Sequence, residues 1–249
     1  MQIAGYLKTS LIEWPGKIAS VIFTPGCNFR CPFCHNRDLV RCKDAKRQSF
    51  KEEEVFADLA SRKKWIDAVV ITGGEPTLQT SLSGFLSRVK RMGYSTMIHT
   101  NGTKPEVISE LAISKLVDYF CLDLKGDLGN YKKYIGIQKS KGKSQNYKAK
   151  VKTSIELVIK SGLEYEFRTT VVPGLHTEKN LISLANEING VFRNLKLEIR
   201  NCRWYLQQFR PMNTLDKRYL KVKPFSREKV ESFQNSLKKI IPQVFLRGI

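Results

Sequence analysis

Short, continuous hydrophobic runs alternate along this chain with segments in which hydrophobic residues recur every three or four positions. Continuous runs are typical of strands buried on both faces of a parallel sheet, and the three-to-four spacing is typical of amphipathic helices. The predicted strands cover residues 19–24, 67–72, 95–99, 116–124, 165–172 and 195–199. The predicted helices cover residues 52–63, 82–91, 105–114, 150–161, 178–189 and 226–240. Strands that alternate with helices in this way indicate an α/β fold with a parallel sheet.

The number of strand–helix units suggests the architecture. Six units are fewer than a closed (β/α)8 barrel requires, so the pattern favours a partial, open (β/α)6 barrel. The length of 249 residues suits one large α/β domain or two small ones. No break in composition divides the chain, which predicts a single domain over residues 1–249.

The chain carries an excess of basic residues, with 43 lysines and arginines against 23 acidic residues and a formal net charge of +20. The densest block of lysines spans residues 125–152, and its middle, 139–144, is predicted to be a loop. Such charge suits nucleic acid or an acidic protein partner. The nearby tyrosines do not repeat as a stacking platform would, so nucleic acid is the less favoured partner and a docking protein the more favoured.

The sequence predicts a cytoplasmic protein without a membrane segment. No hydrophobic stretch is long enough to span a bilayer, and the first residues lack the layout of a secretory signal. Six cysteines in a chain of this size indicate a reducing compartment and not a disulfide framework. Cys121 and Cys202 lie in or beside predicted strands, where they are expected to be small buried hydrophobic residues.

The other cysteines include a C-x3-C-x2-C run formed by Cys27, Cys31 and Cys34. The run follows strand 19–24, which places it at the carboxyl end of a strand, where α/β proteins bind ligands. Three thiolates are one fewer than a closed cubane iron–sulfur site requires, so one coordination position is open. The alternative is a zinc site. Its candidate fourth ligands are His35, which is too close to Cys34 to fold back easily, and Cys42, which could reach.

A second motif, Gly73-Gly74-Glu75-Pro76, follows the next strand along the chain. Paired glycines allow a ligand to approach the backbone because they have no Cβ. Exposed carbonyls and the Glu75 carboxylate could then accept hydrogen bonds from a cationic ammonium group. Since the carboxyl ends of parallel strands share one edge of the sheet, this motif is expected to lie beside the cysteine run.

Polar residues also end the following strands. Thr100 and Asn101 follow the third strand, and Asp123 and Lys125 close the fourth. Asp123 and Lys125 are two residues apart in a strand, so they point to the same face and can share one site. Lys125 suits a carboxylate ligand and Asp123 a hydroxyl group or a cation. Arg168, inside the fifth strand, needs a partner, for which a carboxylate in the barrel mouth is expected.

Together these motifs resemble the radical S-adenosylmethionine (SAM) enzymes that activate glycyl-radical enzymes. The resemblance implies a [4Fe–4S] cluster on Cys27, Cys31 and Cys34, with SAM bound at the fourth iron. It implies that SAM contacts residues beside the cysteines and at the strand ends: Phe33, His35, Gly73, Gly74, Glu75, Pro76, Thr100, Asn101, Asp123, Lys125 and Arg168. Segments 8–17 and 206–211 are similar to the long form of the anaerobic ribonucleoside-triphosphate reductase activating protein.

The resemblance also implies a reaction. An electron from a flavodoxin or ferredoxin would cleave SAM to methionine and a 5′-deoxyadenosyl radical, which would take a hydrogen atom from a glycine Cα. The glycine would belong to the large subunit of an anaerobic ribonucleotide reductase. No residue of this chain is required as a proton-transfer acid or base. The alternatives are a pyruvate formate-lyase-type activating enzyme, a radical SAM enzyme acting on a small molecule or RNA, and a non-catalytic metal-binding adaptor.

Two departures from the pyruvate formate-lyase activators favour the reductase. Those enzymes carry an aspartate that helps to form a monovalent-cation site, where this chain has His99. They also carry a SAM-contacting histidine in a segment that corresponds to residues 206–209 here. This chain lacks that histidine, and Gln208 is the residue that could replace its polar contact.

Overall fold

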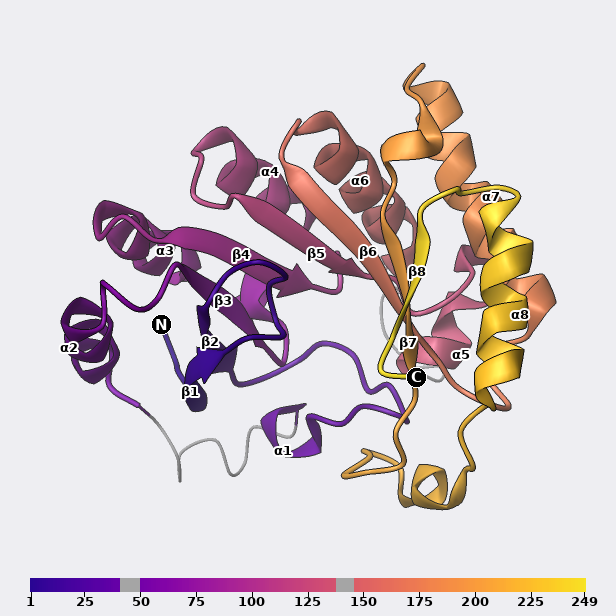
Figure 1. The fold of residues 1–249 in the computed structure, drawn as a ribbon, viewed down its shortest axis with the longest axis horizontal. Coiled ribbons are helices and arrows are strands. Elements are labelled where there is room, and N and C mark those ends of the chain that lie inside the picture. Colours follow the sequence, from indigo (N-terminus) through magenta and orange to yellow (C-terminus); the bar gives the residue numbers. More distant parts are fainter. Residues whose placement is uncertain (41–49, 138–145) are drawn as a thin grey trace.

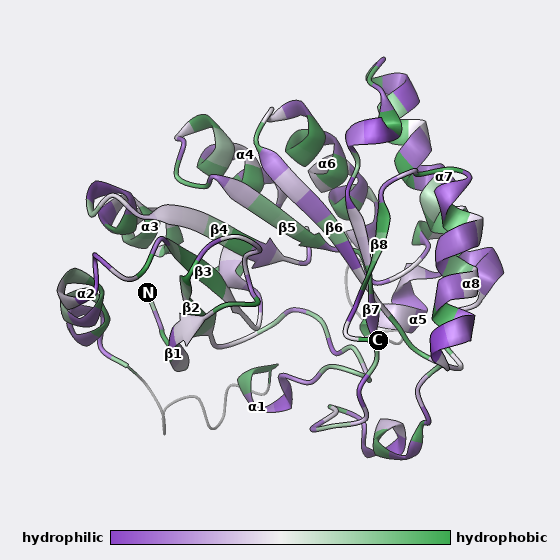
Figure 2. Ribbon diagram, in the orientation of Figure 1, coloured by the Kyte–Doolittle hydropathy of each residue, from purple (hydrophilic) through white to green (hydrophobic). Residues whose placement is uncertain are grey.

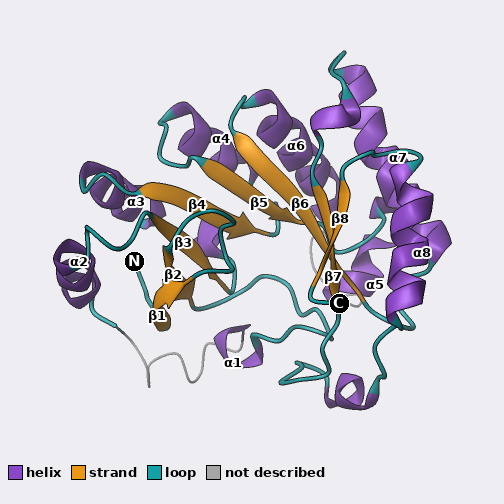
Figure 3. Cartoon of the chain, viewed as in Figure 1, coloured by secondary structure: helices purple, strands orange, loops and turns teal. Residues whose placement is uncertain are grey.

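The computed structural model describes residues 1–40, 50–137 and 146–249. Within these residues, eight strands form a single sheet in which neighbours follow the order of the sequence (Figures 1 and 3). The first strand pairs antiparallel with the second, and the strands from β2 to β8 are parallel. The strands are β1 Gly5–Ser10, β2 Ala19–Thr24, β3 Ala68–Gly73, β4 Ser95–Thr100, β5 Tyr119–Asp123, β6 Glu164–Val171, β7 Trp204–Gln208 and β8 Val244–Arg247.

The larger helices lie along one side of this sheet (Figure 1). Figure 2 shows that α8 carries both hydrophobic and hydrophilic residues, as an amphipathic helix does. The α-helices are α1 Arg37–Val40, α2 Glu52–Ser61, α3 Leu82–Arg91, α4 Pro105–Ile113, α5 Tyr131–Ile135, α6 Tyr147–Lys160, α7 Glu178–Asn194 and α8 Arg227–Lys238. Short 3-10 turns are η2 Pro76–Leu78, η3 Leu128–Asn130, η4 Ile199–Asn201 and η5 Lys217–Lys221. Among the helices of the described ranges, none is long and apolar enough to cross a membrane.

The six predicted helices are present, and α3 has the predicted bounds. The prediction of a strand at 195–199 was wrong, because α7 runs to Asn194 and a 3-10 turn begins at Ile199. The strand that pairs with β6 is instead β7, whose Trp204 is fully buried and donates its indole N–H to Thr169 Oγ1 at 3.0 Å. Leu197, inside the wrongly predicted strand, is 48% exposed. Burial of Trp204 therefore decides which segment joins the sheet.

The α/β class is confirmed, and the sheet is larger than predicted. Strands β2 to β7 supply the six parallel strands that were expected, while the antiparallel β1 and the parallel β8 extend the sheet at its two edges. No pairing between β1 and β8 occurs among the described residues, so the sheet does not close on itself. The predicted loop at 139–144 lies outside the described residues.

Alternation along the strands separates two faces of the sheet. Ile22, Ile71, Ile98 and Phe120 belong to the hydrophobic cluster that includes residues of α2, α3 and α4. The intervening residues belong to a second cluster, closed by Trp14: Ala19, Val21, Ala68, Val70, Met97, Tyr119 and Cys121. Cys121 and Cys202 are fully buried, as predicted. The same alternation continues to the carboxyl ends of the strands. There the positions on the face that carries the Trp14 cluster become polar.

Candidate functional site

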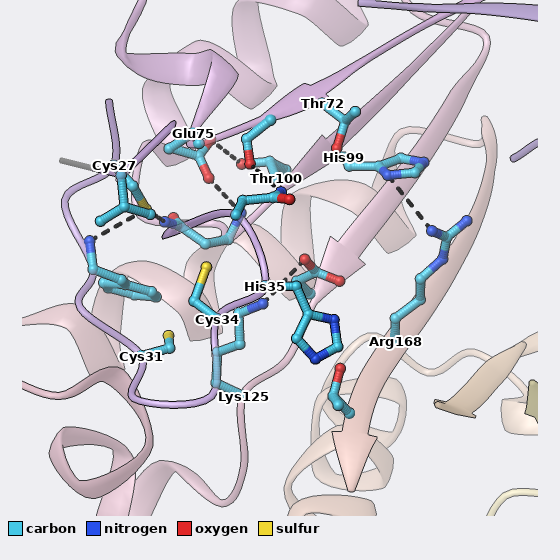
Figure 4. Close-up of a pocket in the computed structure, with 18 of the residues that line it drawn as sticks. Cys27, Cys31, Cys34, His35, Thr72, Glu75, His99, Thr100, Lys125 and Arg168 are labelled. Carbon is cyan, nitrogen blue, oxygen red and sulfur yellow. Dashed lines mark hydrogen bonds and ion pairs between the residues drawn. The ribbon is translucent and has the colours of Figure 1, made fainter. Parts of the chain in front are cut away.

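A cavity of about 350 Å³ opens at the carboxyl ends of the parallel strands (Figure 4). Nearly all the residues that the sequence pointed to line this one space: Cys27, Cys31, Phe33, Cys34, His35, Gly73, Gly74, Glu75, Thr100, Asn101, Asp123, Lys125 and Arg168. Pro76 does not line it, because it is buried as the first residue of η2. The fold thus brings together motifs that are up to 141 residues apart in the sequence, from Cys27 to Arg168.

The cysteine loop is held in place by backbone hydrogen bonds from several parts of the fold. Arg30 N donates to Ile135 O at the end of α5 at 2.9 Å, and Cys34 N donates to Cys31 O at 3.0 Å. On the other side, Leu215 N donates to Cys34 O at 3.1 Å. The loop therefore has a shape fixed by the protein, which presents its three thiols to the cavity (Figure 4).

The chemistry of the three thiols fits an iron–sulfur cluster. Burial raises the pKa of Cys27 to about 12 and raises the pKa values of Cys31 and Cys34 as well. Thiols with such pKa values become thiolates only when a cationic centre compensates the charge. No three His, Cys, Asp or Glu side chains in the described residues are arranged to hold a single ion. A [4Fe–4S] cluster makes a different demand, because each thiolate binds a different iron. Cys42, the candidate zinc ligand, lies outside the described residues.

The glycine pair joins the second motif to the cysteine loop. Gly74 N donates to Thr24 O and Glu75 N donates to Gly26 O, both at 2.8 Å. A Cβ on Gly74 would lie 1.9 Å from Gly26 O, far inside contact distance. We expected these glycines to give a ligand access to the backbone. The structure shows that Gly74 is required first for the close approach of two protein loops.

Glu75 connects this turn to the next strand end. Its side chain is 1% exposed. Oε1 accepts hydrogen bonds from Thr77 N, Thr77 Oγ1 and Thr100 Oγ1, and Oε2 accepts one from Asn101 N at 2.7 Å. Burial raises the pKa of Glu75, and these hydrogen bonds oppose that effect. The expected contact with an ammonium group is therefore restricted to the remaining lone pair of Oε2, while the carboxylate mainly ties the two turns together.

Asp123 and Lys125 share the cavity, as their spacing on one face predicted. Lys125 Nζ lies 3.1 Å from Asp123 Oδ2, and the lysine side chain is 20% exposed. Burial alone would lower the pKa of Lys125, but the charge and the hydrogen bond of the Asp123 carboxylate raise it. Lys125 is therefore a stable cation at the wall of the cavity, suited to bind a carboxylate.

Arg168 has a different partner from the one expected. Its guanidinium pairs with Glu166, two residues earlier on the same face of β6, and not with a carboxylate in the mouth of the sheet. Glu166 is fully buried and also accepts hydrogen bonds from Tyr119 Oη at 3.1 Å and Arg247 Nη1 at 3.3 Å. Sequence reasoning missed Glu166, although its E-x-R spacing with Arg168 in a strand was the available signal.

Two polar groups of this cluster have no protein partner among the described residues, namely Arg168 Nη2 and His99 Nε2. Burial and the charge of Arg168 hold the pKa of His99 well below its usual range, so the ring is neutral. Arg168 Nη1 lies 3.5 Å from His99 Nδ1, which must accept because a guanidinium only donates. His99 Nε2 then carries the proton. Two residues that line the cavity thus each keep one buried N–H donor without a protein partner. A neutral ring beside a guanidinium disfavours a monovalent cation here.

Sequence reasoning also missed polar residues that line the cavity, namely Glu13, Asn36, Thr170 and Gln207. Asn36 donates its side-chain amide to Gly73 O at 2.9 Å, which ties the far end of the cysteine loop to the glycine pair. The suggestion that Gln208 replaces a histidine was wrong. Gln208 faces away and donates to Phe225 O, whereas Gln207, on the opposite face of β7, lines the cavity.

Comparison with known proteins agrees with the family that the sequence motifs resemble. The family model of the radical SAM superfamily matches residues 21–185. A Methanocaldococcus jannaschii protein, provisionally named as a glycyl-radical enzyme activating enzyme, is 32% identical over 99% of this chain and 96% of its own length. The pyruvate formate-lyase-activating enzyme of Clostridium pasteurianum is 29% identical over 93% of this chain and 94% of its own length.

Solved structures share the fold at low sequence identity. Streptococcus suis SuiB, in a crystal structure bound to S-adenosylmethionine, has a TM-score of 0.63 and 18% identity over 92% of this chain and 52% of its own. A structure of TYW1 has a TM-score of 0.58 and 15% identity over 89% of this chain and 73% of its own. These similarities show the fold and carry no information about the substrate.

Proposed function

The chain belongs to the radical SAM superfamily, and from that premise we propose that it generates the glycyl radical of an anaerobic ribonucleoside-triphosphate reductase. The family uses a [4Fe–4S] cluster and SAM, and the relatives identify the chain as an enzyme of the glycyl-radical-enzyme activating type. The whole of residues 1–249 is proposed to act as one radical SAM domain in the cytoplasm. The observation that carries the proposal is the convergence of the cysteine loop, the Gly73–Gly74–Glu75 turn and the Asp123–Lys125 pair on one cavity.

Each group has a proposed role that follows from its geometry. Cys27, Cys31 and Cys34 would hold the cluster. Lys125 and the free donor of Arg168 suit the carboxylate of SAM, since both residues are cations that line the cavity. Asp123 suits a hydroxyl group. When bound, the cluster and SAM supply one low-potential electron and a carbon-centred radical that can take a hydrogen atom.

The protein itself has little proton chemistry to perform. Its residues bind and orient the cofactors and exclude water, and the hydrogen atom passes from a glycine Cα of the partner without a general acid or base. Glycine suits this reaction because its Cα radical is delocalised along the backbone. We propose that the partner glycine reaches the cavity on an extended loop, through the side on which the sheet is open.

The choice of target rests on the chain's departures from the pyruvate formate-lyase activators. His99 stands beside Arg168, an arrangement that disfavours the cation site of those enzymes, and the segment around Phe209 lacks their SAM-contacting histidine. The relative from Clostridium pasteurianum favours pyruvate formate-lyase as the second candidate.

Electron paramagnetic resonance with two partners tests this choice. Reconstituted protein, SAM and reductant are mixed anaerobically with the large subunit of an anaerobic ribonucleotide reductase or with pyruvate formate-lyase. We expect a glycine-radical doublet on the reductase and none on the lyase. A doublet on the lyase alone would keep the chemistry and overturn the target. SAM cleavage without a radical on either partner would favour a small-molecule or RNA substrate.

For the electron donor, we propose a flavodoxin or ferredoxin with an acidic surface. The segment that binds the outer side of the cysteine loop is basic. Asp216 N donates to Pro32 O at 2.9 Å, and the exposed Lys217, Arg218, Lys221 and Lys223 follow immediately. A protein docked there would lie against the backbone of the cysteine loop, and opposite charges would accelerate its association.

Charge reversal tests this donor surface. The double variant Lys217→Glu, Lys221→Glu should slow cluster reduction by reduced flavodoxin about tenfold at low salt, with the difference shrinking as salt increases. The matched control, Lys238→Glu, Lys239→Glu at the far end of α8, has the same charge change and should have little effect. Reduction by dithionite should be equal in all three proteins. Equal slowing by both double variants would show that only net charge matters.

A further inference from the structure

His176 connects two turns that border the cavity without lining the cavity itself. It is 2% exposed. Its Nδ1 lies 3.0 Å from Val172 N, in the turn that follows β6, and its Nε2 lies 3.0 Å from Lys125 O, in the turn that follows β5. One side chain therefore binds the backbone of the residue whose ammonium group forms part of the cavity wall.

The two hydrogen bonds define the state of the ring. A backbone N–H can only donate, so Nδ1 must accept from Val172, and a carbonyl can only accept, so Nε2 must donate to Lys125. The ring is consequently neutral with its proton on Nε2. Burial lowers the pKa of His176 to about 4, which agrees with a neutral ring at physiological pH.

Aromatic contacts hold the ring in this position. Tyr134 of α5 stacks on His176 with 4.9 Å between ring centroids, and Tyr134 Oη donates to Asp127 Oδ1. Gly126, directly after Lys125, lies so close to the Tyr134 ring that a Cβ there would be 2.4 Å away. Phe33 of the cysteine loop also packs against His176 in an edge-on arrangement, with 6.4 Å between ring centroids. The turn that carries Lys125 therefore contacts the Tyr134 ring at Gly126 and the His176 ring at the Lys125 carbonyl. His176 in turn links it to the backbone of Val172 after β6.

We propose that His176 is a positioning residue for SAM, which sets the place of the Lys125 ammonium group through the hydrogen bond to the Lys125 carbonyl. This inference rests on the proposed SAM site. Val172 and Lys125 belong to neighbouring strand ends, and the imidazole is the side chain that hydrogen-bonds to the backbone of both residues. Its effect on SAM is therefore transmitted through Lys125 and requires no contact between His176 and the ligand.

The experiment compares two amide variants that each keep one of the two hydrogen bonds. The amide of His176→Gln can occupy the Nε2 position and donate to Lys125 O. The amide of His176→Asn occupies the Nδ1 position and can accept only from Val172 N. SAM binding to anaerobically reconstituted protein is measured by calorimetry in both variants, in Lys125→Ala, and in the double variant Lys125→Ala, His176→Asn. Iron content and melting temperature report whether each protein folds and holds its cluster.

We expect Lys125→Ala to weaken SAM binding about tenfold or more, because it removes a charge-assisted contact. His176→Asn should weaken binding about fivefold, and His176→Gln should remain within about twofold of the natural protein. The double variant should bind SAM as weakly as Lys125→Ala alone, since the effects of residues that act through one contact are not additive.

Three results would overturn the account, and they are distinguishable. Unchanged binding in Lys125→Ala would show that the SAM site itself is misplaced. Equal losses in the two amide variants, with Lys125→Ala as expected, would show that His176 only stabilises the fold. An additive loss in the double variant would show that His176 acts on SAM by a route that does not involve Lys125.

Discussion

Replacing any one of Cys27, Cys31 and Cys34 by alanine is expected to abolish the cluster. Anaerobically reconstituted natural protein should hold about four irons per chain and show a brown charge-transfer band. Each single variant leaves only two thiols, and burial raises their pKa values and so disfavours the thiolates that a cluster requires. Iron content should fall to nearly zero. Iron analysis and the visible spectrum measure the effect directly.

Two other cysteines provide matched controls. Cys121 and Cys202 are fully buried, and neither lines the cavity that the cysteine loop borders. Alanine at either position should lower stability by roughly 1 kcal/mol while leaving the iron content unchanged. Stoichiometric zinc in the natural protein, with no incorporation of iron, would contradict the cluster assignment.

Gly74→Ala is expected to have the second largest effect. The new Cβ would lie 1.9 Å from Gly26 O, and both atoms belong to backbone segments that hydrogen bonds fix to each other. The turn and the start of the cysteine loop must separate, at a cost of roughly 2–4 kcal/mol. We expect the melting temperature to fall by on the order of 10 °C, together with loss of SAM binding and a lower iron content.

Gly84→Ala is the control for this substitution. Gly84 lies on the exposed side of α3, and a Cβ there meets nothing within 4 Å. Alanine should stabilise the helix by up to about 1 kcal/mol and leave both cofactors bound. If Gly74→Ala retained the cluster and lost only SAM, the glycine would serve ligand access alone, and the contact with Gly26 would be unimportant.

The local pattern predicted the helices well because amphipathic spacing is a property of each segment by itself. The bounds of α3 were predicted from Leu82 to Arg91 in this way. The site was predictable for a related reason. Parallel strands place their carboxyl ends together, so motifs at successive strand ends had to meet. Of the residues expected at the site, Pro76 and Gln208 lie outside the lining of the cavity.

The errors came from contacts that no local pattern encodes. The segment at 195–199 alternates like a strand. The segment that joins the sheet is nevertheless β7, whose Trp204 is fully buried and donates a hydrogen bond to Thr169. The register of β7 then decides that Gln207, and not Gln208, faces the cavity. Glu75 was expected to serve a ligand, but the donors around it include Thr100 and Asn101, which only the folded sheet brings near. Long-range partners thus determine the roles of residues that the motifs identify.

Transfer of deuterium from glycine tests the central claim most directly. The partner reductase is prepared with glycine deuterated at Cα and mixed anaerobically with reconstituted protein, SAM and reductant. If this chain takes the hydrogen atom from the partner's glycine, the 5′-deoxyadenosine that forms must carry one deuterium, and Lys125→Ala should reduce the yield. Formation of 5′-deoxyadenosine without deuterium, at the same rate with and without the partner, would contradict the account.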